Sequence, residues 1–207
     1  MTGKPPARAR IYLVRHGETD WNVEERLLSF TDMPLNARGE DQARTPGEEL
    51  AAEGIGFDHV RCSPRVRATR SAELILGRLP GSPAPVLDDR LVEVDFGPLE
   101  GRTAEELAAD PGAVAWRAGA PYPGVETGEQ VESRARAAWA DLPVEGTTFL
   151  VAHGRFLRNL IGICVLDLPA GAAAADRMRM RNCRPAVVEP GRVPLLLSLN
   201  AGPPYRQ

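Results

Sequence analysis

Apolar residues along this chain fall into short continuous runs, separated by longer amphipathic or turn-rich stretches. The clearest runs are residues 11–14 (IYLV) and 147–152 (TTFLVA), and both are rich in residues that favour strands. A continuous apolar strand is typical of a sheet that is covered on both faces. Each run leads, directly or after one residue, to a histidine followed by glycine. The pattern therefore predicts two buried strands that carry histidines at their carboxyl ends.

The rest of the pattern predicts shorter strands, several helices and one turn-rich excursion. Further strands are expected at 57–62, 187–188 and 193–199, the last two joined by a turn at Pro190-Gly191. Helices are expected from about 37 with Asn36 as N-cap, from Ser63 as N-cap and Pro64 to about 79, and at 103–109, 130–142 and 156–165. Pro46-Gly47 is expected to kink or break the first helix. Residues 91–96 are predicted to be extended.

Strands that alternate with helices along one chain indicate an α/β fold. We predict three layers, α/β/α, with a mostly parallel central sheet and a flap over the active site at the carboxyl ends of the strands. The Pro/Gly-rich stretch 111–128 marks this flap, which we expect to be an insertion over about 100–128. The whole chain, 1–207, is predicted to be a single domain with a flexible tail at 1–9.

Composition and charge narrow the classes of function. The net charge of −3 argues against a general nucleic-acid binder, because no basic excess is present to neutralise a phosphate backbone. The three cysteines lack a C-x-x-C spacing, so neither a disulfide framework nor a zinc site is indicated. The sequence shows no apolar run long enough for a bilayer and no signal pattern. We therefore expect a reduced, cytoplasmic protein with no membrane partner.

Two of the three histidines, His16 and His153, follow the two best strands. Ligands of open α/β sheets bind outside the carboxyl ends of the strands, so both histidines are expected at one site. Gly17 and Gly154, directly after them, would let backbone N–H groups approach an anion. The helix after His153 would also point its positive end at this site. His59, at the entrance of a strand, is interpreted as structural.

The residues around these histidines form motifs that resemble a known family. The chain is similar to the histidine phosphatase superfamily, also called the phosphoglycerate-mutase-like family. The opening motif at 15–22 (RHGETDWN) is followed by 32–35 (DMPL), Gly39 and Gln42-Ala43. The later motifs, in family order, are 63–68 (SPRVRA), 91–101 (LVEVDFGPLEG), 124–127 (GVET) and 151–158 (VAHGRFLR).

The resemblance implies a covalent mechanism that centres on His16. This histidine would attack phosphorus as the neutral imidazole and carry the phosphoryl group, with its tautomer fixed by the carbonyl of Gly17. Glu93 maps to the proton donor, and burial is expected to keep it protonated at rest. The resemblance implies no metal and no cofactor, because arginine and histidine charge takes the place of the usual magnesium ion.

The resemblance also implies which groups hold the phosphate. Arg15 and Arg67 would grip its equatorial oxygens bidentately. His153 would donate to the same oxygens, and is expected to be cationic beside them. Asn22 would add a neutral hydrogen bond, and Gly154 a backbone N–H.

Neighbouring residues receive simpler interpretations. The acidic side chains near the motifs are expected to stabilise loops: Glu18, Asp20, Asp95 and Glu100. The additional arginines are expected to be surface or helix-end charges: Arg65, Arg70, Arg155 and Arg158. Arg155 carries one reservation, because a long cation there could reach an anionic substrate. Ser29 and Phe30 are predicted to form a substrate loop, in which the Ser29 hydroxyl could contact a substrate carboxylate.

Three functions follow, and the sequence favours the first. Residues 93–97 (EVDFG) resemble the phosphatase branch, whereas mutases typically have Glu-Arg-His-Tyr-Gly there. We therefore expect hydrolysis of a small phosphate monoester, with a cofactor-dependent phosphoglycerate mutase as the alternative. A catalytically inactive phospho-ligand binder is disfavoured, because all five core residues are present. The identity of the phosphorylated substrate and the oligomeric state, a homodimer among the options, stay open.

Overall fold

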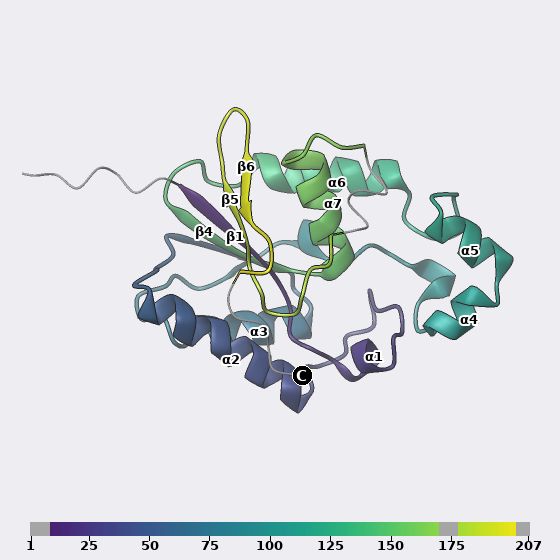
Figure 1. The fold of residues 1–207 in the computed structure, drawn as a ribbon, viewed down its shortest axis with the longest axis horizontal. Helices are drawn as coiled ribbons and strands as arrows, with labels where there is room; N and C mark the ends of the chain where they lie inside the picture. Colours follow the sequence, from purple (N-terminus) through teal and green to yellow (C-terminus); the bar gives the residue numbers. More distant parts are fainter. Residues whose placement is uncertain (1–8, 170–177, 202–207) are drawn as a thin grey trace, which may run out of the picture.

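One mixed sheet forms the centre of the computed structural model, which describes residues 9–169 and 178–201 (Figure 1). The sheet contains six strands in the order β3-β2-β4-β1-β5-β6. Their bounds are β1 Arg10–Arg15, β2 His59–Cys62, β3 Val86–Leu87, β4 Thr147–Ala152, β5 Ala186–Glu189 and β6 Leu195–Ser198. The pairs β1–β4, β2–β4 and β2–β3 are parallel, whereas β5 is antiparallel to β1 and β6 is antiparallel to β5. The predicted mostly parallel sheet is confirmed.

The strand register brings three chain segments to one edge of the sheet. Arg15 at the end of β1 pairs with Ala152 at the end of β4, and Cys62 at the end of β2 pairs with Val151. The residues that follow these strands stay tied to β4. The N–H of His16 donates to the Ala152 carbonyl at 3.1 Å. Parallel pairing in this register therefore gathers the residue after each strand at a common edge.

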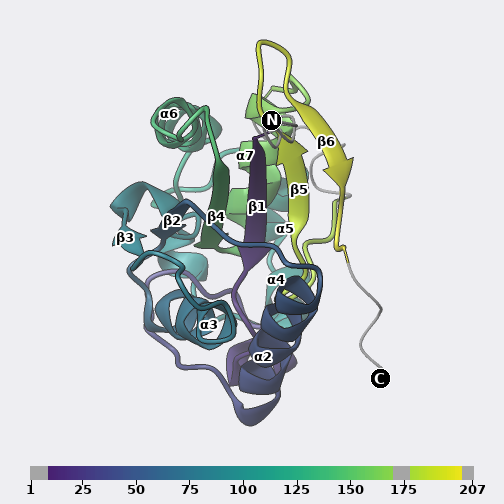
Figure 2. The same ribbon diagram turned by 90° about the vertical axis from the view of Figure 1, so that its left-hand side faces the viewer.

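Helices cover both faces of the sheet, as the continuous apolar strands predict (Figures 1 and 2). Helices α2 (Ala37–Ala52) and α3 (Val66–Leu76) pack on one face, and α6 (Gly128–Ala140) and α7 (Gly154–Cys164) on the other. The alternation of strand side chains divides the apolar residues between two cores. In β1, Leu13 packs with α6 and α7, whereas Val14 packs with α2 and α3. The three-layer prediction is confirmed.

The predicted flap is a folded unit rather than an irregular loop. It contains a 3-10 turn (Gly97–Leu99), α4 (Ala104–Ala108) and α5 (Pro111–Arg117), at the end of the molecule remote from β6 (Figure 1). The unit has its own apolar cluster, in which Phe96 meets Trp116 edge-on at 5.9 Å between ring centroids. Helix α4 confirms the prediction for 103–109, but α5 was missed. Its signal is present in the sequence, because Asp110 caps the helix and Pro111 follows at the first helical position.

Two local predictions about helices are wrong. Helix α2 begins after Asn36, as expected, but runs through Pro46 without a break, so the expected break is wrong and the alternative of a kink stays a prediction. Gly47 packs closely on α3, because a Cβ there would meet the Ile75 carbonyl oxygen at 2.5 Å. Helix α3 begins at Val66 with Arg65 as its N-cap, whereas the hydroxyl of Ser63, the expected N-cap, lies 2.8 Å from His153 Nε2.

Several smaller features complete the described chain. The short helix α1 (Asp20–Val23) and a 3-10 turn at Asp89–Leu91 flank the site segments. No helix in the described ranges is long and apolar enough to cross a membrane. The predicted tail lies, up to residue 8, outside the described residues.

Candidate active site

His16 is held in one tautomer at the end of β1. Its Nδ1 lies 2.7 Å from the carbonyl oxygen of Gly17, and since a carbonyl only accepts, Nδ1 carries the proton. The other ring nitrogen, Nε2, then keeps its lone pair in the neutral ring. Burial, followed by the charges of Arg67 and Arg15, lowers the pKa of His16 well below its usual value. The side chain is therefore a neutral imidazole with its lone pair on Nε2, the tautomer that the resemblance implied, and its role as nucleophile stays a prediction.

The loop that carries His16 is fixed from three sides. The Asn182 amide donates to the His16 carbonyl oxygen at 2.7 Å, and the Gly17 N–H donates to the Ser71 hydroxyl at 2.9 Å. The sequence analysis expected the Gly17 N–H to face a bound anion, and this is wrong because the Ser71 hydroxyl accepts its hydrogen bond. Glycine is needed here for space, because a Cβ on Gly17 would meet the Gly39 carbonyl oxygen at 2.4 Å. Close packing of the loop on the start of α2 holds His16 in place.

His153 lies beside His16, with 5.1 Å between the ring centroids. It is fully buried, and its Nε2 is 2.8 Å from the Ser63 hydroxyl. Burial is the largest cause that lowers the pKa of His153 well below its usual value, and the charges of Arg67, His16 and Arg15 act in the same direction. Burial and the neighbouring arginines therefore favour the neutral ring, and the cationic form expected beside phosphate oxygens stays a prediction. As a neutral ring it still has one N–H to donate.

Arg67 is fully buried and is not among the residues that line the pocket. Its two terminal nitrogens donate to the carbonyl oxygens of Thr31 at 3.0 Å and Ser29 at 2.7 Å. Burial lowers the pKa of Arg67 to about 10, so the guanidinium stays charged at neutral pH. Its charge lowers the pKa of both histidines, which places it near them. In this structure Arg67 fastens the loop at 29–31, and its expected grip on phosphate stays a prediction.

Arg15 lines the pocket at the carboxyl end of β1. One terminal nitrogen donates to the Met180 carbonyl oxygen at 3.2 Å. Burial and the charges of Arg158 and Arg179 lower its pKa, whereas Glu93 raises it. Gly154 makes room for this side chain, because a Cβ there would lie 3.2 Å from the Arg15 Nε. The two residues expected to contact phosphate at this end of the site thus lie against each other.

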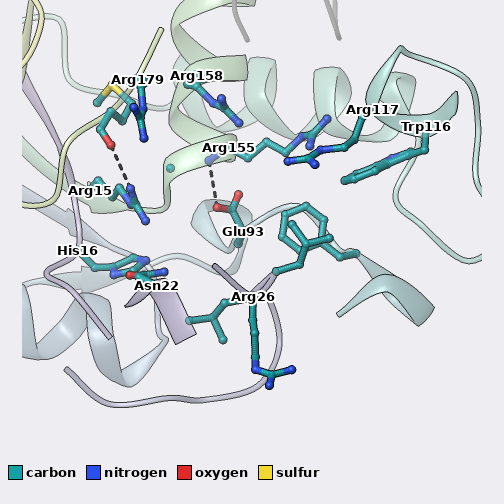
Figure 3. Close-up of a pocket in the computed structure, with 15 residues that line it drawn as sticks. Arg15, His16, Asn22, Arg26, Glu93, Trp116, Arg117, Arg155, Arg158 and Arg179 are labelled. Carbon is teal, nitrogen blue, oxygen red and sulfur yellow. Dashed lines mark hydrogen bonds between the residues drawn. The ribbon is translucent and has the colours of Figure 1, made fainter. Parts of the chain in front are cut away.

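Glu93 is anchored at the N-terminus of α7 (Figure 3). Its Oε1 accepts from the N–H groups of Val94 at 2.9 Å and Phe156 at 2.7 Å, and its Oε2 accepts from Arg155 at 3.0 Å. The positive end of α7 therefore holds the Glu93 carboxyl group, which lines the pocket, so this helix end points at the site as expected. Oε2 accepts one bond and has two lone pairs, so a proton on Oε2 is compatible with all three bonds. The protonated resting state stays a prediction.

The predicted substrate loop divides between a buried and an exposed residue. Ser29 is 1% exposed and its hydroxyl donates to Glu100 Oε2 at 3.1 Å, so the expected contact with a substrate carboxylate is wrong. Glu100 stabilises this loop, as predicted, because it also accepts from the N–H of Thr31. Phe30 is exposed and lies under the Arg65 guanidinium, 4.4 Å from the ring centroid.

The pocket encloses about 260 Å³ between β1, α7 and the flap unit. Asn22 lines it as predicted, with its Oδ1 engaged by the Thr19 N–H and its amide nitrogen left as a donor. Arg155 and Arg158, interpreted as surface or helix-end charges, both line the pocket, which agrees with the reservation made for Arg155. Sequence reasoning missed several other lining residues, which no motif contains: Arg26, Trp116, Arg117 and Arg179.

Arg155 has a fixed orientation in this pocket. Its guanidinium lies over the Trp116 ring, 4.4 Å from the centroid. The signal for Arg155 and Arg158 was their spacing, since residues three apart after His153 share one face of a helix that begins at the site. Among the described residues, no three His, Cys, Asp or Glu side chains gather as a metal-ligand group.

Comparisons with known proteins agree with this geometry. The sequence model of the histidine phosphatase superfamily (branch 1) matches residues 11–194. A protein of Salmonella paratyphi B named as a probable phosphoglycerate mutase is 38% identical over 184 residues, which cover 84% of this chain and 81% of that protein. The α-ribazole phosphatase from Shigella flexneri has a TM-score of 0.80 at 26% identity, over 93% of this chain and 96% of that one. A mycobacterial glucosyl-3-phosphoglycerate phosphatase, in a complex with VO3, has a TM-score of 0.80 at 29% identity, over 95% of this chain and all of that one.

Proposed function

Since the chain belongs to branch 1 of the histidine phosphatase superfamily, we propose that it hydrolyses a small phosphate monoester through a phosphohistidine on His16. One observation carries the proposal. The His16 tautomer is locked with its proton on Nδ1, and the same pocket contains Arg15 and the anchored carboxyl of Glu93. A nucleophile, a cation and a proton donor around one cavity are the groups that phosphoryl transfer requires.

The first half of the reaction transfers the phosphoryl group to His16. The Nε2 lone pair attacks phosphorus, a P–N bond forms and the P–O bond to the leaving group breaks. Glu93 gives its proton to the departing oxygen, so that an alcohol leaves rather than an alkoxide. Arg15 balances the charge that spreads over the equatorial oxygens.

The second half returns the enzyme to its starting state. Glu93, now a carboxylate, takes a proton from water as the water oxygen attacks phosphorus. The P–N bond breaks, inorganic phosphate leaves and the lone pair returns to Nε2. Glu93 regains its proton and His16 its neutral ring, so that no net proton is consumed by either residue.

The experiment measures both turnover and the intermediate. The purified protein is incubated with phosphate monoesters in the presence of a chelator, and free phosphate is followed over time. Rapid quench with a labelled ester should trap an acid-labile, base-stable phosphoryl group on His16. The His16→Ala variant should lose turnover and label together. Full activity in that variant would remove the proposal, and phosphate binding without label in the native protein would favour an inactive binder.

Mutase activity is a second candidate, favoured by the 38% identity to a probable phosphoglycerate mutase. A mutase must return the phosphoryl group to the substrate rather than to water, so its phosphohistidine has to resist hydrolysis. The two candidates separate in one assay with labelled phosphoglycerate. Isomerisation faster than phosphate release identifies a mutase, and phosphate release without isomerisation identifies a phosphatase.

A further inference from the structure

The segment that carries Glu93 is buried but has no regular secondary structure. Residues 93–96 belong to neither a helix nor a strand, and Val94 and Phe96 are buried. Backbone N–H and C=O groups in such a segment have no helical or sheet partners, so they need hydrogen-bond partners from elsewhere in the chain. The position of Glu93 therefore depends on the side chains that bond to the backbone around it.

Arg134 on α6 bonds to the backbone that precedes Glu93. One of its terminal nitrogens donates to the carbonyl oxygens of Arg90 at 2.8 Å and Val92 at 2.7 Å. Its Nε and its other terminal nitrogen donate to the two carboxylate oxygens of Glu126 at 3.0 and 2.7 Å, which makes a bidentate pair. The two side chains are only 16% and 13% exposed, so salt and water screen this pair less than a surface pair.

Glu126 bonds to the backbone that follows Glu93. Its Oε2 accepts from the Asp95 N–H at 3.1 Å, and its own N–H donates to the Asp95 carbonyl oxygen at 2.8 Å. The ion pair thus holds the chain one residue before Glu93 and two residues after it. Because Arg134 and Glu126 also hold each other, the loss of either side chain should loosen both ends of this stretch.

Arg134 also contacts the residue to which the Glu93 carboxyl group is bonded. Its guanidinium lies over the Phe156 ring, 4.6 Å from the centroid. The Phe156 N–H is the group that donates to Glu93 Oε1 at 2.7 Å. Helices α6 and α7 lie side by side (Figure 1). One side chain on α6 therefore touches both the segment that carries the carboxyl group and the residue of α7 that anchors it.

The pair has no place in the active-site pocket itself. Neither Arg134 nor Glu126 lines that pocket, whereas both line a separate cavity of about 450 Å³, together with Glu93. Neither side chain is therefore placed to contact the substrate in the pocket. Any effect of the pair on turnover has to pass through the position of another residue, and Glu93 is the pocket residue whose segment it holds.

We propose that Arg134 and Glu126 are positioning residues for the proton donor, and that their ion pair keeps the Glu93 carboxyl group within reach of the leaving-group oxygen. The inference rests on the proposed function, because it takes Glu93 to be the proton donor. A general acid has to lie within hydrogen-bond reach of the oxygen that it protonates, and a displacement of about 1 Å can cost roughly 10²-fold in rate. The motif at 124–127, to which the mechanism gives no part, thus acts through Glu126.

The leaving group of the ester tests the proposal. In Arg134→Gln, kcat/KM for glycerol 3-phosphate should fall by about 10- to 100-fold, because its alkoxide needs a well-placed proton. For p-nitrophenyl phosphate, whose phenolate leaves without a proton, kcat/KM should fall by less than about threefold. Arg134→Lys keeps the charge and serves if the glutamine variant does not fold. Its single nitrogen cannot make the bidentate pair and both carbonyl bonds, so we expect a loss of about tenfold on glycerol 3-phosphate alone.

A second substitution and a control show whether the effect passes through Glu93. In a Glu93→Gln background, Arg134→Gln should lower kcat/KM for glycerol 3-phosphate by less than about twofold more, because the group that it positions is already gone. Arg10→Gln is the matched control, since Arg10 and Glu189 also form a half-buried ion pair, but at the end of β1 remote from His16. It should leave the ratio of kcat/KM for the two esters unchanged, whatever its effect on Tm.

The outcomes separate this inference from the proposed function. Equal losses on both esters in the Arg134 variants, or no loss on either, would overturn the positioning role while leaving the phosphatase intact. A full additional loss in the Glu93→Gln background would also overturn it. A native protein that releases no phosphate from any phosphate monoester would overturn the proposed function itself.

Discussion

Replacing Glu93 with glutamine tests both the architecture of the site and its chemistry. The carboxyl accepts three backbone N–H groups, two at Oε1 and one at Oε2. Glutamine has one carbonyl oxygen and one amide nitrogen. With the oxygen at the Oε1 position, the bonds from Val94 and Phe156 survive, but the new amide nitrogen faces the N–H of Arg155. Two donors then point at each other, and one buried N–H loses its acceptor.

The cost of this change can be worked from the contacts. An unsatisfied buried donor lowers the free energy of unfolding by about 1–3 kcal/mol. For a domain of this size each kcal/mol moves Tm by about 2–4 °C, so Glu93→Gln should melt roughly 2–12 °C lower. Loss of a general acid should cost about 10²- to 10⁴-fold in kcat/KM for an alkyl ester. Differential scanning calorimetry and steady-state kinetics measure the two effects separately.

The leaving group distinguishes proton donation from a general loss of structure. With p-nitrophenyl phosphate the phenolate departs without a proton, so Glu93→Gln should retain a much larger fraction of its rate in the first half-reaction. With glycerol 3-phosphate the alkoxide needs the proton, and the loss should be large. Glu73→Gln, at an exposed position on α3 that pairs with Arg70, is the control and should match the native protein. An equal loss on both esters would refute Glu93 as the proton donor, and an unchanged Tm would refute the three-bond anchor.

Three further predictions concern the supports of the site. His16 and His153 are buried and their pKa values are lowered, so below about pH 6.5 the unfolded chain binds more protons than the folded protein. As the pH falls, the free energy of unfolding should therefore decrease by up to about 1.4 kcal/mol per pH unit for each histidine. Urea denaturation between pH 7.5 and 5.5 measures this decrease, and a free energy of unfolding that does not change with pH contradicts it. Gly39→Ala should lower the free energy of unfolding by about 1–3 kcal/mol and remove most of the activity, because its Cβ would lie 2.1 Å from the backbone oxygen of Glu18, in the loop that carries His16. The control Gly56→Ala, whose Cβ would have no atom within 4 Å, should change neither stability nor activity. Ser63→Ala removes the hydroxyl that is hydrogen-bonded to His153, so it should lower the free energy of unfolding by about 1–3 kcal/mol. Urea titration measures this change, and a variant as stable as the native protein would contradict the importance of this bond.

Local signals explain why much of the fold, and the position of His16 at the end of a strand, could be predicted from the sequence. Strands β1 and β4 are continuous apolar runs, and the register of a parallel sheet brings the residues after them together. The N-cap of α2 follows from Asn36, which accepts from a backbone N–H of its own helix, and the helix predicted at 103–109 is α4. Each of these predictions depends on residues close in the sequence or on one rule of sheet geometry, and so one sequence was sufficient.

The predictions that failed depend on partners far away in the chain. Ser63 reads as an N-cap, yet its hydroxyl lies against His153, 90 residues later. Ser29 reads as a substrate contact, but its hydroxyl donates to Glu100 across 71 residues. Each hydroxyl could have bonded to a nearby group, the backbone for Ser63 and a substrate for Ser29. Tertiary packing instead places a distant residue beside each one. A motif gives the residue type at such a position but not the partner.

The N-terminal turn of α7 shows how one local signal can carry several functions that the sequence does not separate. His153 packs against His16, Gly154 makes room for Arg15, and the N–H groups of Arg155 and Phe156 fix Glu93. The backbone of Arg155 thus helps to hold Glu93, the proposed proton donor, while its guanidinium lines the pocket. A side-chain substitution at 155 keeps the backbone N–H, so it should leave Glu93 in place. A shift of the whole turn would displace His153, Gly154 and the anchor of Glu93 together.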